Sequence, residues 1–87
     1  MDASPLEFPC DYAVKVMGRH TPEFRAQMLA VLAAATGEAP ADERVAERLS
    51  RDGHFVSLTC TVRVADRAQL DHIYRRLHAT GLVLYAL

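Results

Sequence analysis

The sequence predicts an α+β fold in which two helices cover one face of a four-stranded antiparallel sheet. Residues 55–64 alternate apolar and more polar side chains without a break, which is typical of a strand with one dry face. Two capped amphipathic segments flank this strand along the chain. The chain therefore reads strand, helix, a charged segment, strand, helix and strand within 87 residues.

Composition favours one folded domain. Hydrophobic residues make up 51% of the chain and charged residues 24%, which excludes intrinsic disorder as the default. Residues 1–7 are predicted to be a flexible lead-in and 8–87 a single domain. The first residues lack the basic and apolar regions of a secretory signal, and no apolar run is long enough to span a membrane. We therefore expect a cytoplasmic protein without membrane contact.

The first strand is expected over Asp11–Met17, with Tyr12, Val14 and Val16 facing the helices. Gly18 then allows a turn. The first helix is expected over 22–36, because Thr21 can cap it and a proline follows at the first helical position.

Residues 38–52 are ambiguous, since their alanine-rich and charged composition favours a helix. A strand over 43–50 is nevertheless expected, because it would pair with 55–64 through a turn at Asp52-Gly53. The residues Val45, Glu47 and Leu49 would then face the core, and Arg44, Ala46 and Arg48 would face solvent.

The second helix is expected to start at Asp66, with Gln69 completing a variant capping box, and to close at Gly81. Residues 82–87 are apolar on both faces as a last strand. Such a strand is either covered or presents one face to another chain, so we expect a homo-oligomer, a dimer in the simplest case.

The order βαββαβ is the ferredoxin-like arrangement, in which the first and third strands are central. The expected core consists of Tyr12, Val14, Val16, Phe24, Met28, Val31, Leu32, Val56, Leu58, Cys60, Val62, Val64, Leu70, Ile73, Tyr74 and Leu77.

Charge and cysteine content narrow the function classes. A net charge of −1 disfavours generic nucleic-acid binding. Cys10 and Cys60 are too few and too distant for a zinc site, and the alternation places Cys60 in the core. A thiol enzyme built from Cys10 with His20 or His54 is a weak alternative. We expect no enzyme activity, no cofactor and no metal.

The candidate binding residues gather where the first strand ends. Basic side chains and a glycine there precede a helix start, whose free amides favour anions. His54 stands beside a glycine at a strand entrance. The predicted ligand or partner site consists of Lys15, Gly18, Arg19, His20, His54 and Phe55.

Two further surfaces come into consideration. Lys15, Phe55 and Arg63 should emerge on the open sheet face, which gives RNA binding as an alternative, although stacking is poorly supported there. Arg75-Arg76 on the second helix is a possible docking patch for an acidic partner, but the helix dipole explains it by default.

Several segments together resemble the YbeD-like family of small bacterial proteins of unknown function. They are Phe8-Pro9, Tyr12, Lys15-Val16-Met17-Gly18, Ser50, Gly53-His54-Phe55-Val56-Ser57, Ile73-Tyr74, Leu77, Val83 and Leu87.

The resemblance spans about residues 7–87 and implies a ferredoxin-like fold similar to ACT domains, which regulate amino-acid metabolism. Genes of the family often neighbour those for lipoate attachment, so the resemblance implies a small anionic ligand or a partner enzyme. It supplies no catalytic residues. His54-Phe55 departs from the family's Asn-Tyr type of pair, and the charged segment before Ser50 puts the second strand in doubt.

Overall fold

The computed structural model describes residues 6–87, and its elements follow the expected βαββαβ order. The fold class predicted from the sequence is confirmed. The elements are β1 (Cys10–Arg19), α1 (Pro22–Thr36), a 3-10 turn η1 (Asp42–Arg44), β2 (Val45–Leu49), β3 (Phe55–Val64), α2 (Arg67–Ala79) and β4 (Tyr85–Ala86).

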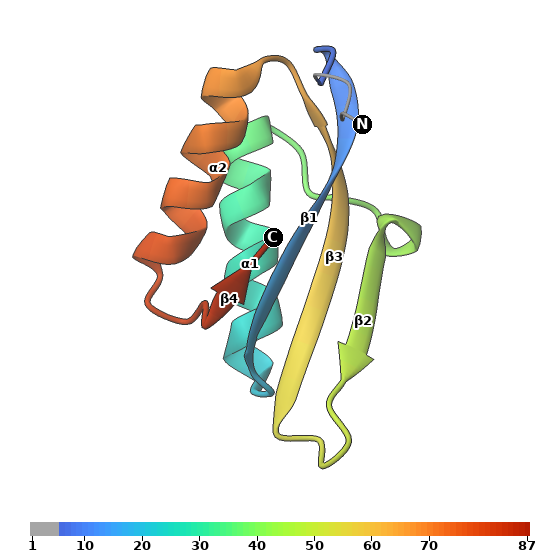
Figure 1. Ribbon diagram of the computed structural model, residues 1–87, viewed down its shortest axis with the longest axis vertical. Helices are drawn as coiled ribbons and strands as arrows, with labels where there is room; N and C mark the ends of the chain where they lie inside the picture. The colour runs from blue at the N-terminus through green and yellow to red at the C-terminus, as the bar shows by residue number, and fades with distance from the viewer. Residues whose placement is uncertain (1–5) are drawn as a thin grey trace, which may run out of the picture.

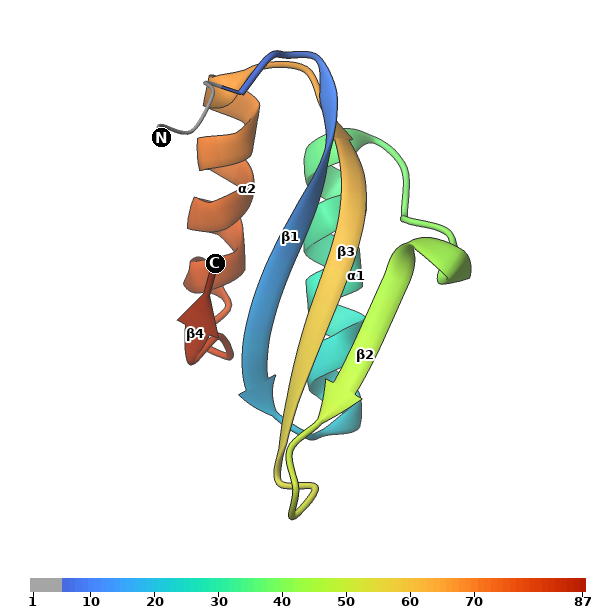
Figure 2. The same ribbon diagram turned by 45° about the vertical axis from the view of Figure 1, so that its right-hand side comes forward.

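The four strands form one antiparallel sheet in the order β2-β3-β1-β4, so β1 and β3 are central as predicted. They pair over their whole length, from Cys10 opposite Val64 to Arg19 opposite Phe55. Both helices lie against one face of the sheet (Figure 1). The other face is left uncovered by the protein's own helices, as the rotated view in Figure 2 shows. We call it the open face.

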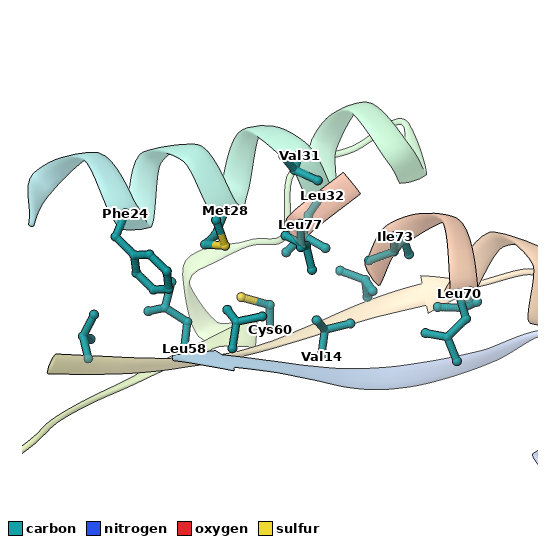
Figure 3. Packing of buried hydrophobic residues seen from close by; sticks show 14 residues of the cluster. Val14, Phe24, Met28, Val31, Leu32, Leu58, Cys60, Leu70, Ile73 and Leu77 are labelled. Carbon is teal, nitrogen blue, oxygen red and sulfur yellow. The ribbon is translucent and has the colours of Figure 1, made fainter. Parts of the chain in front are cut away.

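Side-chain alternation assigns the strand residues to the two faces. Val14 of β1 lies opposite Cys60 of β3, and both are buried under the helices at 1% exposure. Side chains of both helices, such as Phe24 and Ile73, point toward the sheet (Figure 3). The buried core consists of Val14, Val16, Phe24, Met28, Val31, Leu32, Val56, Leu58, Cys60, Val62, Val64, Leu70, Ile73 and Leu77.

Two predicted core residues, Tyr12 and Tyr74, are instead only partly buried. Both pack against the edge of the core, where their rings are apolar and their hydroxyl groups need a polar partner. The Tyr74 hydroxyl donates a hydrogen bond to the carbonyl oxygen of Leu87, so it ties α2 to the end of the last strand. Burial, followed by the neighbouring Tyr12 hydroxyl, raises the pKa of Tyr74 above its usual value.

Both helices begin at the predicted caps. The Thr21 hydroxyl accepts a hydrogen bond from the Phe24 amide at 3.2 Å, and α1 covers the predicted 22–36. The Asp66 carboxylate accepts one from the Gln69 amide at 2.8 Å. The Gln69 side chain in turn accepts one from the Ala65 amide at 2.6 Å. Within residues 6–87, neither helix is long and apolar enough to cross a membrane.

The ambiguous segment 38–52 contains a strand, as expected, but its predicted buried face is mostly wrong. Val45 and Leu49 lie on the helix side of the sheet, yet only Val45 is half-buried, and Leu49 is 48% exposed. Glu47 is also exposed and forms an ion pair with Arg25 of α1 at 2.9 Å. The reason is position: β2 is an edge strand, and α1 covers its neighbour β3 more fully than it covers β2 (Figure 1).

The last strand is shorter than predicted. Only Tyr85–Ala86 is a strand, because residues 82–84 first cross from α2 back to the sheet edge. Its pairing with β1 is extended by a hydrogen bond from the Leu87 amide to the Lys15 carbonyl at 2.9 Å. Most of the predicted flexible lead-in, residues 1–5, lies outside the described residues, and positions 6 and 7 are exposed.

Candidate functional site

Five of the six predicted site residues meet at one end of the sheet, where β1 ends and the β2–β3 turn folds back (Figure 2). We call this region the loop end; it consists of residues 18–21 and 50–55. The His20 amide donates a hydrogen bond to the His54 carbonyl at 2.9 Å. The His20 ring nitrogen Nδ1 lies 3.1 Å from the Gly53 carbonyl oxygen. Segments 33 residues apart in sequence are thereby joined.

The β2–β3 turn is held by the Asp52 carboxylate. It accepts hydrogen bonds from the His54 amide at 3.0 Å and from the Ser50 hydroxyl at 2.8 Å. These two bonds, the first more than the second, hold the pKa of Asp52 below its usual value. The same carboxylate lies 3.3 Å from Nδ1 of His54, and Ser50 Oγ accepts from the Phe55 amide at 3.1 Å. The turn is therefore ordered by its own polar groups.

Arg19 and Phe55 form the other contact of the loop end. They are directly opposed in the β1–β3 pairing, and the Arg19 guanidinium lies over the Phe55 ring at 5.6 Å from its centroid. A cation over a ring face is held by the ring's quadrupole. This contact occupies one face of Phe55 and orients Arg19 on the open face of the sheet.

Gly18 has a packing role. It is buried, and a methyl group at its position would lie 2.3 Å from Cε1 of Phe24 and 2.7 Å from the Leu82 carbonyl oxygen. Both distances are far below van der Waals contact, so only glycine lets β1, α1 and the returning chain approach this closely. Packing alone therefore explains why position 18 is a glycine, without a bound ligand.

Lys15 lies apart from the other five predicted residues. It is on the open face near the middle of β1, opposite Thr59 of β3 and hydrogen-bonded through its backbone to Leu87. It shares this face with Arg19, four residues further along the same strand. Lys15 therefore belongs to the sheet surface and not to the turn.

The loop end offers few uncommitted groups for a small anion. A groove of about 300 Å³ lies at the start of α1, lined in part by His20, Thr21 and Arg25. The Arg25 guanidinium there is already paired with Glu47 at 2.9 Å. The Thr21 hydroxyl caps the helix, and His20 contacts Gly53. The groove thus has its positive groups largely satisfied within the protein.

The residues of the weakest candidate from the sequence, a thiol enzyme built from Cys10 and a histidine, do not lie together. Cys10 begins β1 and His20 follows its other end, so about 30 Å of extended strand separates them. His54 lies with His20 at the loop end. Burial raises the pKa of the Cys60 thiol, which is 1% exposed. Among residues 6–87, no three histidine, cysteine or acidic side chains gather in a way that could hold a metal ion.

The open face, on which Lys15, Phe55 and Arg63 were expected, extends further than the sequence indicates. The pairing of β3 with β2 brings Arg48 beside Ser57, on the same open face as Lys15 and Arg63. Arg44 reaches that face as well, with its guanidinium 3.4 Å from Asp11. The period-two pattern of each strand was a sufficient signal for its own face, but only the register shows that these faces join.

Comparison with known proteins places the chain. The family described as "Protein of unknown function (DUF493)" matches residues 3–87. The chain belongs to this family. The resemblance to the YbeD-like family seen in the sequence is confirmed, since the similar DUF493 relatives are bacterial proteins named UPF0250.

Three relatives show the extent of the similarity within the DUF493 family. The UPF0250 protein of Bordetella pertussis is 44% identical over 84 residues, covering 94% of this chain and 89% of that protein. The relative from Paraburkholderia phytofirmans is 41% identical over 83 residues, with 95% and 92% covered. The one from Nitrosomonas europaea is 34% identical over 82 residues, with 94% and 93% covered.

A solved structure has the same fold as this DUF493 member. The solution structure of protein HP0495 from H. pylori superposes with a TM-score of 0.70 at 14% identity, covering 98% of this chain and 88% of that chain. At this identity the likeness concerns the fold alone.

Proposed function

We propose that this protein is a non-catalytic regulatory module, ACT-like in architecture, that acts by docking on a partner protein. One observation carries the proposal: the open face is uncovered, and large apolar side chains are exposed on it. Met17 of β1 and Tyr85 of β4 are directly paired there and are 38% and 58% exposed, and the adjacent Leu87 is 60% exposed. Exposed apolar clusters of this kind mark interaction sites.

Docking is better supported than the sensing of a small anionic metabolite. At the loop end, where such a ligand was expected, His20 and His54 are engaged in contacts within the protein, and Arg25 of the adjacent α1 is paired with Glu47. Isothermal titration with amino acids, lipoyl and octanoyl compounds and nucleotides separates the two forms of the proposal. Saturable heat from any of these compounds, abolished by His20→Ala, would favour sensing instead.

Self-association is part of the same proposal. The strand β4 is at the edge of the sheet and is only two residues long, and Leu84 beside it is 58% exposed. An edge strand has unpaired backbone groups that a second copy can use. Sedimentation equilibrium of the full chain should show a dimer that Leu84→Asp weakens, and a concentration-independent monomer would refute this part.

The docking proposal is tested by cross-linking the tagged full chain in cells, identifying the captured protein by mass spectrometry and repeating the binding with both proteins purified. The proposal sets the encounter in the cytoplasm, and lipoate-attachment enzymes are the first candidates on family resemblance. Met17→Asp with Tyr85→Asp should abolish the purified interaction. Leu6→Asp, at a residue 42% exposed, is the matched control and should leave it unchanged. Equal binding by both variants would contradict the proposal.

RNA binding through the open face is the second candidate, favoured by Lys15 and Arg63 on that face. In RNA-binding domains of this topology, bases of the single strand stack on aromatic rings exposed on the sheet. Phe55 is half-buried, and Arg19 already lies over its ring. A gel shift with single-stranded RNA at low salt tests this candidate, since phosphate contacts require a steep loss of affinity with added salt.

A further inference from the structure

The open face has an excess of positive charge that the net charge of the chain conceals. Lys15 and Arg19 lie on it from β1, and Arg63 lies on it from β3. Arg48 of β2 is on the same face, and Arg44 reaches it. The chain as a whole has a net charge of −1, so the rest of the molecule is net acidic.

These cations are only partly neutralised. Asp11 is the one acidic strand residue that the register places on the open face of the described chain, and it is shared. Its two carboxylate oxygens lie 3.5 Å from the Arg63 guanidinium and 3.4 Å from that of Arg44. Within residues 6–87, Lys15, Arg19 and Arg48 form no salt bridge.

The centre of the face is suited to close contact. Side chains that are small or that have a hydroxyl group line this centre, among them Ala13, Thr59 and Thr61. Towards the loop end, a groove of about 250 Å³ is lined by residues of β1, β3 and β2, Met17 and Arg48 among them. This groove is large enough to receive one apolar side chain, with cations at its rim.

We propose that the open face docks an acidic, amphipathic helix of the partner protein. Its apolar side would lie over the small residues, with one side chain in the groove beside Met17. Its carboxylates would meet Lys15, Arg19 and Arg48. Helices pack on sheet faces throughout α+β domains, so this occupant covers the open face as α1 and α2 cover the other. The inference rests on the docking function proposed above and specifies the chemistry of the partner.

Charge disfavours a second copy of the chain that meets this face with its own open face. Two copies meeting open face to open face would bring five cations against five, with Asp11 the one carboxylate on each side. Like charges in a closing interface are unfavourable. An acidic protein has the opposite charge to this face, and so does RNA. The bases of RNA, however, would have few exposed aromatic rings to stack on along the central strands.

The test is an amide NMR titration of the full-length protein with two synthetic helical peptides. Both peptides have the same leucine and alanine stripe; one has glutamates flanking it and the other lysines. The glutamate peptide should shift the amides of Ala13, Lys15, Met17 and Thr59, and the lysine peptide should not. Binding should weaken as salt is added, because the contacts at the rim are screened.

Two double variants test which positive side chains contribute to binding of the glutamate peptide. Lys15→Gln with Arg48→Gln should weaken the glutamate peptide about tenfold, the combined effect of two rim charges. Arg75→Gln with Arg76→Gln removes the same charge from the exposed side of α2 and should leave binding unchanged. All four residues are exposed, so the fold should survive in both variants, which thermal unfolding checks.

Each other outcome overturns the inference. No shifts on the open face with the glutamate peptide would reject an acidic partner. Tighter binding of a single-stranded RNA to the same amides would assign the face to nucleic acid. A larger loss in the Arg75→Gln and Arg76→Gln variant would move the docking site to α2. If the partner identified by cross-linking binds the Lys15→Gln and Arg48→Gln variant as well as it binds the wild type, docking stands and this inference fails.

Discussion

Replacing Gly18 by alanine should destabilise the protein strongly, although alanine is usually harmless in a strand. The added methyl group would lie 2.3 Å from Cε1 and 2.6 Å from Cδ1 of Phe24, whose side chain is 1% exposed and cannot swing away. It would also lie 2.7 Å from the carbonyl oxygen of Leu82, which is backbone. Relief therefore requires β1, α1 and the chain before β4 to move apart.

The magnitude follows from two opposed effects. Overpacking a dense core costs about 1–3 kcal/mol, and two rigid neighbours place Gly18→Ala near the upper end. The lower entropy of the unfolded alanine chain offsets at most about 1 kcal/mol. The net loss in unfolding free energy is about 2 kcal/mol, which lowers Tm by roughly 8–16 °C for a domain of this size.

Urea and thermal unfolding of Gly18→Ala, Phe24→Leu and the double variant measure this effect. Leucine lacks the ring atom Cε1, so the two substitutions should couple favourably, and the double variant should be more stable than the sum of the single losses predicts. Gly37→Ala is the control: nothing lies within 4 Å of its added methyl group, and its φ of 89° costs about 1 kcal/mol by itself. A Gly18→Ala protein as stable as wild type would refute the packing argument.

Three further predictions concern the core and its titrating groups. The free energy of unfolding should fall as pH rises above about 10, the pKa of unfolded tyrosine, because Tyr74 has a raised pKa in the folded state. Urea titrations of Tyr74→Phe should show a smaller fall of unfolding free energy with pH, and an unchanged fall would contradict the prediction. A thiol reagent should modify half-buried Cys10 quickly and Cys60 only on unfolding; equal rates in native protein would show that β3 is not covered. Leu58→Ala should cost about 3 kcal/mol by urea unfolding, whereas Leu49→Ala, at an exposed position on the same face, should cost under about 1; comparable losses would refute the difference in burial between the two positions.

Local signals along the chain were enough to predict the elements and most of the core. Unbroken alternation over residues 55–64 fixed the buried face of β3, since a period of two leaves one arrangement in which the valines avoid water. Thr21 and Asp66 fixed the helix starts because each side chain satisfies an amide that the helix cannot. These are local effects, and they operate wherever such residues occur.

The exposure of edge strands and the composition of surfaces depend on how the elements pack together. Leu49 has the right parity for burial and is still exposed, because burial needs a covering helix and β2 lies at the sheet edge. Gly18 looked like a loop residue until Phe24 and Leu82 were seen against it. The basic open face depends on the register that brings Lys15 of β1 and Arg48 of β2 to the same face on either side of β3. Strand register is a long-range property that local sequence does not determine.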